Sequence, residues 1–206
     1  MPAPNENISR IALRENPLRL AGIRAHDCWR SGAEDLGNAA DACSDHRQAS
    51  GGRFEDVSAK SGITRAFGAG LGVMGTDLSG DGWPDIFVAN DSVPNLLFRN
   101  NRNGTFTEIG LASGLALSLD GKAQAGMGAD AGDYDGDGRL DVFVTNFSQD
   151  HNTLYQNTGD GSFRDVTYPA AVATPGLPYL GWGTGFADFD NDGLLDIFVA
   201  NGHVYP

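Results

Sequence analysis

The sequence lacks features that would indicate a membrane protein. No apolar run reaches the roughly 18 residues that a transmembrane helix needs, so we expect no membrane span. The first ten residues, Met1 to Arg10, also lack the apolar segment of a secretory signal. The chain itself therefore shows no signal peptide.

Histidine and cysteine are scarce, with four His and two Cys among 206 residues. The histidines occur in no spacing typical of a Ser/His/Asp or Cys/His catalytic site. His26, Cys28, Cys43 and His46 fit no standard zinc signature. Cys28 and Cys43 could form one disulfide or remain thiols, so the redox compartment stays open.

Basic residues are few, with 14 Lys and Arg against 27 Asp and Glu and a formal net charge of −13. Residues 51–206 hold 20 acidic and 8 basic residues, and 11 of these acids lie in three short stretches. Such a chain is a poor partner for nucleic acid or an anionic membrane. Bound divalent cations would offset much of the imbalance, whereas a solvated acidic face is the alternative.

The three acidic stretches share one spacing. Asp133 to Asp141 reads DYDGDGRLD, with carboxylates at positions 1, 3, 5 and 9 and Gly138 at position 6. A short peptide wraps oxygen ligands around a hard cation such as Ca²⁺ in this way. Residues 188–196 repeat the pattern in full, whereas residues 77–85 have Ser79 at position 3. The starts at 77, 133 and 188 are 56 and 55 residues apart, which predicts a repeat protein.

Two other interpretations compete with a metal loop. Asp-Gly pairs are common in ordinary turns, but three copies with carboxylates at the same offsets favour ion binding. An EF-hand would need Glu at position 12 and flanking helices. Position 12 is Val88, Val144 or Val199, and the flanks are strand-like, both of which argue against an EF-hand.

Between the loops the sequence runs through a fixed order of four predicted strands. A Gly-rich strand precedes each loop, a continuous apolar strand follows it, a third strand comes next, and a Gly-x-Phe strand ends the repeat. The predicted Gly-rich strands are 66–74, 125–131 and 180–187, and the predicted apolar strands are 85–90, 141–146 and 196–201. The predicted third strands are 95–100 and 152–157, and the predicted Gly-x-Phe strands are 52–57, 104–109 and 161–166.

These strand patterns predict features of the packing. The second strand is apolar on both faces, which is typical of a sheet buried between other sheets. The Gly-rich strand indicates a crowded place where backbones converge, as at the axis of a propeller. Asn103-Gly104 and Asp160-Gly161 suit tight hairpins. We therefore expect an all-β fold of four-stranded antiparallel blades.

Residues 1–51 do not share the repeat and are predicted to form an irregular or disordered leader. Residues 8–24 could form a short amphipathic helix, but Pro17 interrupts it. Residues 52–206 form the second predicted unit, a set of propeller-type blades.

The repeat resembles a known family. Gly126-Met127-Gly128 leads into the loop at 133–141, and Gly-Trp-Gly-Thr-Gly at 181–185 leads into the loop at 188–196, with Gly-His-Val-Tyr-Pro at 202–206. These motifs resemble FG-GAP or VCBS-type β-propeller repeats. They are most similar to propellers that an ASPIC/UnbV domain follows, as in the cartilage acidic protein group and its bacterial relatives. We expect this chain to lack the family's C-terminal domain.

This resemblance implies a Ca²⁺ loop between the first and second strands of each blade, as in the integrin α-subunit propeller, and about three ions in all. Carried over by position, the implied ligands are side chains at positions 1, 3, 5 and 9 and the carbonyl at position 7: Asp77, Ser79, Asp81, Trp83 and Asp85; Asp133, Asp135, Asp137, Arg139 and Asp141; Asp188, Asp190, Asp192, Leu194 and Asp196. Leu78, Tyr134 and Phe189, at position 2, are expected to pack inward.

The resemblance also implies an incomplete propeller. The chain supplies about two full blades and parts of two others, whereas a closed propeller needs at least about four blades. We therefore expect a fragment whose exposed strand edges favour association.

The resemblance implies a non-catalytic, calcium-binding scaffold for interaction with an extracellular protein or carbohydrate. The parent protein would be extracellular, periplasmic or cell-surface. One alternative is the calcium-bearing part of a carbohydrate-active enzyme, for which His203 at a strand end could face a ligand. Another is an accessory protein in a bacterial biosynthetic pathway. The sequence names no ligand.

Overall fold

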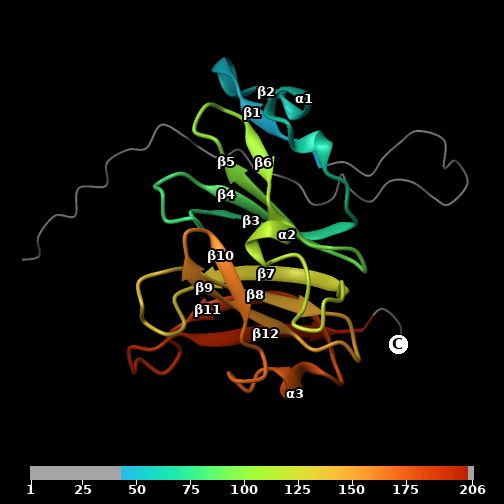
Figure 1. The fold of residues 1–206 in the computed structure, drawn as a ribbon, viewed down its shortest axis with the longest axis vertical. Helices are drawn as coiled ribbons and strands as arrows, with labels where there is room; N and C mark the ends of the chain where they lie inside the picture. The colour runs from blue at the N-terminus through green and yellow to red at the C-terminus, as the bar shows by residue number, and fades with distance from the viewer. Residues whose placement is uncertain (1–42, 204–206) are drawn as a thin grey trace, which may run out of the picture.

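The computed structural model describes residues 43–203, which form antiparallel sheets that follow one another along the long axis of the molecule (Figure 1). The first sheet pairs β1 (His46–Gln48) with β2 (Phe54–Asp56). The short helices between strands are α1 (Ser58–Ser61), α2 (Gly110–Ser113) and α3 (Ala173–Gly176), with 3-10 turns η2 (Ser50–Gly52) and η3 (Ile63–Arg65). Within this range every α-helix has four residues, and none can cross a bilayer.

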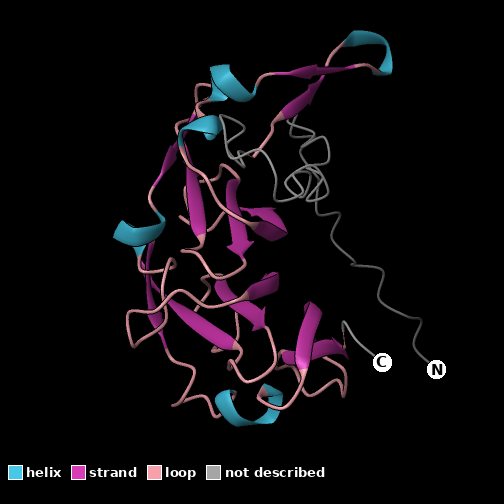
Figure 2. Ribbon diagram, turned by 90° about the vertical axis from the view of Figure 1, so that its right-hand side faces the viewer, coloured by secondary structure: helices cyan, strands magenta, loops and turns pink. Residues whose placement is uncertain are grey.

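Two complete blades confirm the predicted four-stranded repeat. Their strands pair in chain order, and Figure 2 shows the successive sheets from the side. The first blade consists of β3 (Gly70–Thr76), β4 (Asp85–Asn90), β5 (Leu96–Asn100) and β6 (Phe106–Glu108). The second consists of β7 (Gly126–Gly132), β8 (Asp141–Asn146), β9 (Thr153–Gly159) and β10 (Ser162–Asp165), and a last sheet pairs β11 (Leu180–Ala187) with β12 (Asp196–Gly202).

The hairpin that precedes the first blade begins earlier than the repeat pattern indicated. β2 is the predicted lone Gly-x-Phe strand, and it pairs with β1, in register from His46 opposite Asp56 to Gln48 opposite Phe54. β1 lies within the segment assigned to the leader. The predicted helix at 8–24, together with His26 and Cys28, lies outside the described residues, and the division at residue 51 stays a prediction.

The second strand of each full blade is buried along its whole length, as predicted. All six residues of β4 and of β8 are buried. The core between the two blades joins Phe87 of β4 to Val142 and Val144 of β8. β12 has nearly the same sequence, yet Phe198 is 60% exposed. Among the described residues, no further sheet covers the outer face of β12. The burial of the second strand in a blade therefore depends on the presence of a neighbouring blade.

The residue at position 2 of a loop packs against the following blade. Leu78 is fully buried with Val142 and Tyr155 of the second blade. Tyr134 packs in the cluster that the second blade shares with β11 and β12. The same prediction is wrong for Phe189, which is 60% exposed and has a tilted ring contact with Phe198. Phe189 belongs to the last sheet described, where no following blade receives it.

The two predicted tight hairpins differ. Between β9 and β10, Gly159 pairs with Ser162, and Asp160 and Gly161 have φ of 55° and 72°, which confirms a two-residue turn. Between β5 and β6, Asn101 N donates to Thr105 O at 3.0 Å, so the turn spans residues 102–104 and contains the predicted Asn103-Gly104 pair, with Gly104 at a φ of 86°. The Asn103 side chain accepts hydrogen bonds from the N–H and hydroxyl of Thr105, and this turn is one residue longer than that between β9 and β10.

The Gly-rich first strands converge, as predicted. A Cβ added to Gly72 would lie 2.9 Å from the Cα of Gly128. A Cβ added to Gly128 would lie 2.1 Å from the carbonyl oxygen of Trp182. Thr145 Oγ1 joins these strands, because it accepts a hydrogen bond from Gly128 N at 2.9 Å and donates one to Trp182 O at 2.5 Å. β3, β7 and β11 therefore approach each other backbone to backbone.

We expect Gly128→Ala to destabilise the chain by about 1–3 kcal/mol, since the added methyl group has no room between β7 and β11. Gly183→Ala is the matched control, because a Cβ at Gly183 on β11 would meet nothing within 4 Å. Chemical denaturation of the 206-residue chain at fixed calcium concentration measures both. Equal losses in the two variants would contradict close backbone packing at Gly128.

Candidate metal centres

Each acidic loop joins the first strand of a sheet to the second. Residues 77–85 lead from β3 to β4, residues 133–141 from β7 to β8, and residues 188–196 from β11 to β12. Two residues in every loop have left-handed backbone conformations, at positions 4 and 6, and Gly or Asn tolerates that conformation. They are Gly80 and Gly82, Gly136 and Gly138, and Asn191 and Gly193.

The carboxylate at position 1 fixes the curvature of its loop. It accepts hydrogen bonds from the backbone N–H groups at positions 5 and 6 in all three copies. In the second loop, Asp133 accepts from Asp137 N at 3.0 Å and from Gly138 N at 2.9 Å. Asp77 and Asp188 make the same pair of bonds. The shared pattern explains why the three loops have one shape.

The carboxylate at position 9 is held from two sides in the complete blades. Asp85 accepts from Ser79 N at 3.0 Å and from Asn100 N of β5 at 2.8 Å. Asp141 accepts from Tyr134 N at 3.1 Å and from Asn157 N of β9 at 2.7 Å. The third strand of the blade therefore positions a side chain of the loop. Asp196, in the two-stranded sheet, accepts from Phe189 N at 3.0 Å.

Burial raises the pKa of Asp85 and of Asp141 above the ordinary value, while the backbone hydrogen bonds oppose the shift. For Asp141 the nearby Asp135 and Asp137 carboxylates raise the pKa further. Both residues are almost fully buried. The charged form of each is thus costly in the loop alone, and a bound cation would compensate that cost.

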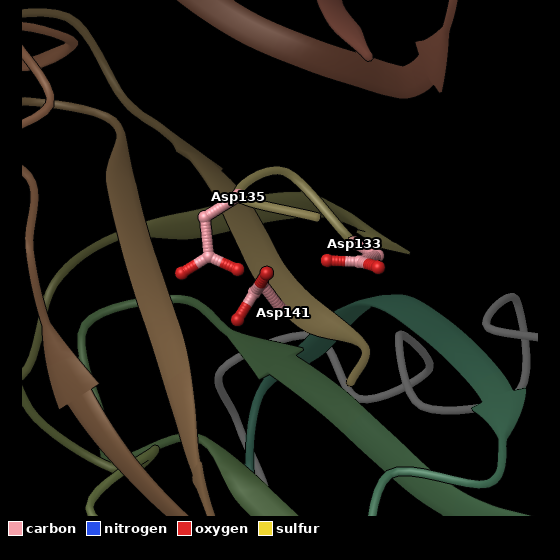
Figure 3. A group of neighbouring side chains, drawn as sticks. All are labelled: Asp133, Asp135 and Asp141. Carbon is pink, nitrogen blue, oxygen red and sulfur yellow. The ribbon is translucent and has the colours of Figure 1, made fainter. Parts of the chain in front are cut away.

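Three carboxylates converge in the second loop. Oxygens of Asp133, Asp135 and Asp141 all lie within 4.8 Å of one another, and Figure 3 shows the three side chains gathered at one point of the loop. Asp188, Asp190 and Asp196 form the same arrangement in the third loop. These are positions 1, 3 and 9. Clustered carboxylate oxygens are the donors that a hard cation such as Ca²⁺ prefers.

The first loop has a hydroxyl in place of the third carboxylate. Ser79 Oγ is buried, and the Ser79 side chain interacts with the Asp85 carboxylate, whose pKa it lowers. Hydroxyl and carboxylate oxygens are both hard donors, so Asp77, Ser79 and Asp85 also fit a hard cation.

The carboxylate at position 5 was predicted to be a ligand, but it does not point to the place where the carboxylates at positions 1, 3 and 9 meet. Asp137 and Asp192 do not belong to the converged groups. Each position-5 carboxylate accepts from the backbone N–H at position 7: Asp81 from Trp83 at 2.9 Å, Asp137 from Arg139 at 2.9 Å, and Asp192 from Leu194 at 2.8 Å. The role of these side chains and of the position-7 carbonyls as ligands stays a prediction.

Sequence reasoning missed several residues that contact the loops. Asn100 and Asn157 occupy the same place in the repeat, which was a usable signal. Gln156 donates to Asp135, and Arg102 pairs with Asp81 at 2.8 Å. The hydrogen bond from Arg102 lowers the pKa of Asp81 below its ordinary value. Gln156 and Arg102 have no counterpart at equal spacing, so the repeat pattern could not reveal them.

The blades and loops together define a propeller-type repeat protein with an acidic loop at a fixed position of each sheet. Residues 77–144 and 133–199 match the FG-GAP-like repeat, and the chain belongs to this family. It is similar to cartilage acidic protein 1 of Mus musculus, at 32% identity over 151 residues, which cover 72% of this chain and 22% of the relative. Cartilage acidic protein 1 of Homo sapiens is also 32% identical, over 72% of this chain and 21% of the relative. The chain thus spans about a fifth of the length of these curated relatives.

We expect Asn157→Ala to destabilise the chain more than Asn100→Ala. The Asn157 amide donates to Leu78 O of the first loop at 2.9 Å and to Leu140 O at 3.1 Å, so its loss leaves carbonyls in two blades without a donor. The Asn100 amide donates to Pro84 O, within its own blade. Each buried carbonyl left without a donor costs about 1–3 kcal/mol. Equal unfolding free energies for the two variants, measured by denaturation, would contradict the link between blades.

Proposed function

We propose that this chain is part of a calcium-stabilised, non-catalytic scaffold that presents propeller loops to an extracellular protein or carbohydrate. The observation that carries the proposal is the repeated convergence of carboxylates at positions 1, 3 and 9. The donors are oxygen atoms, which suits Ca²⁺ better than the softer transition metals. The buried Ser79 Oγ supports a third site of the same kind.

The ion acts on the structure of the blade. Bound Ca²⁺ neutralises the clustered aspartates and fixes the loop that joins the first and second strands. It thereby compensates the burial of Asp85 and Asp141, which hold the third strand through Asn100 N and Asn157 N. The free energy of calcium binding therefore adds to the stability of the folded blade.

A scaffold role is supported by how the loop aspartates are used. The position-1 and position-9 carboxylates accept hydrogen bonds from their own loop and blade, which is a structural use of the acids. The FG-GAP-like repeat supplies a frame on which binding surfaces can be placed.

The extracellular setting is also a proposal. Calcium-binding modules outside cells work at roughly 10⁻⁴–10⁻³ M Ca²⁺, where small oxygen-lined loops are occupied. The relatives carry the name cartilage acidic protein. The relatives are several times longer than this chain, and other parts of such a protein can also bind partners. We therefore propose only the class of ligand, a protein or a carbohydrate.

We expect Ca²⁺ to raise the melting temperature of the chain and a chelator to lower it, because the ion binds the folded loops and not the unfolded chain. Asp135→Asn should weaken binding at the second loop by about tenfold or more, since it removes one of the converged carboxylates. Asp160→Asn is the matched control, an exposed acid at the tip of the β9–β10 hairpin. Calorimetric titration measures the affinities, and a chain that shows neither calcium heat nor a thermal shift would refute the proposal.

The enzyme alternative predicts a different result. Activity on an acidic glycan that is lost in His203→Ala but kept without calcium would favour it. His203 is exposed at the end of β12 and is not in the converged acidic groups.

A further inference from the structure

The three acidic loops differ in how the position-5 carboxylate is occupied. One oxygen of this carboxylate accepts from the position-7 N–H in every loop. The second oxygen of Asp81 pairs with Arg102 Nη2 at 2.8 Å. The second oxygen of Asp137 pairs with Arg139. Among residues 43–203, no Lys or Arg pairs with an aspartate of the third loop, where position 7 is Leu194.

The backbone of Arg102 and the side chain of Arg139 each have a further contact besides the ion pair. Arg102 lies in the β5–β6 loop with φ of 61°, and its backbone N donates to the Asn100 side chain at 2.8 Å. Arg139 Nε donates to Asn157 O of β9 at 2.9 Å. A guanidinium that is already positioned, as that of Arg139 is, loses less conformational freedom in an ion pair than a free surface side chain does. Both arginine side chains are about half exposed, so each pair contributes a modest energy to its loop.

The charge around each loop follows from these contacts. The first loop has three carboxylates and one guanidinium, the second has four and one, and the third has four and none. A guanidinium stabilises a carboxylate cluster that holds no ion. It also opposes the binding of a cation at the neighbouring carboxylates, because two positive charges at short distance repel each other.

We propose that Arg102 and Arg139 are built-in counter-ions that stabilise the first and second loops without calcium and lower their calcium affinity, which leaves the third loop as the strongest site. This inference rests on the proposed function. The expected order of affinity is third loop, second loop, first loop. The first loop is weakest because it combines a counter-ion with the hydroxyl of Ser79. The third loop depends most on the ion.

The test uses Arg102→Gln and Arg139→Gln in the 206-residue chain. Calcium affinity at the altered loop should rise by roughly two- to fivefold, the size expected when one half-exposed ion pair is removed. The melting temperature should fall in chelator and stay near that of the parent chain in saturating calcium. Arg47→Gln is the matched control, because Arg47 pairs with Asp45 at 2.9 Å outside the loops.

Terbium(III) as a luminescent calcium substitute reports on the first loop by itself. Trp83 lies at position 7 of that loop, so the Trp-sensitised luminescence that a Trp83→Phe variant loses comes from an ion bound there. Calorimetry with Ca²⁺ gives the total of all sites. Arg102→Lys keeps the positive charge and should stay close to the parent affinity, and it serves as the folded variant if Arg102→Gln does not fold.

The outcomes separate the two proposals. A parent chain that binds no Ca²⁺ would refute the proposed function. A parent chain that binds Ca²⁺, with Arg102→Gln and Arg139→Gln variants of equal or lower affinity, would refute the counter-ion role and leave the proposed function standing. Equal thermal losses with and without calcium would likewise identify the arginines as ordinary structural residues.

Discussion

The mutual repulsion of carboxylates brought within 4.8 Å of one another is the constraint on which the rest of the structure depends. The loop tolerates it through backbone N–H groups aimed at positions 1 and 9, and two left-handed residues per loop orient those groups. The third strand adds a further donor to Asp85 and Asp141. Loop shape, strand pairing and the burial of an acid in each full blade are thus parts of one electrostatic arrangement.

Much of the fold could be predicted from the sequence because the repeat supplies three copies of each signal. The bounds of β4 and β8 match their predictions, since an Asp at the start and an Asn at the end mark both strands. In the second and third loops the carboxylates at positions 1, 3 and 9 lie together, whereas the position-5 carboxylates do not join them. The Gly-rich strands lie together because glycine leaves room for a second backbone.

The features that were missed depend on neighbours rather than on local pattern. Phe189 and Phe198 resemble buried residues of other blades, yet both are exposed because their sheet is the last one described. The β5–β6 turn has three residues, 102–104, whereas the β9–β10 turn has two, and the Asn-Gly and Asp-Gly dipeptides do not mark this difference. The ion pair of Arg102 with Asp81 joins residues 21 positions apart, and no periodic signal marks it.

The contacts of the first and second loops with the following sheet make the structure a chain of nearest neighbours. Leu78 belongs to the first loop but lies in the second blade's core, and Asn157 of the second blade donates back to Leu78 O. Coupling of this kind passes from one unit only to the next. Whole repeats can therefore be duplicated or deleted during evolution without loss of these contacts. A deletion that began and ended at unlike positions of the repeat would separate a loop from the surface that receives its side chain.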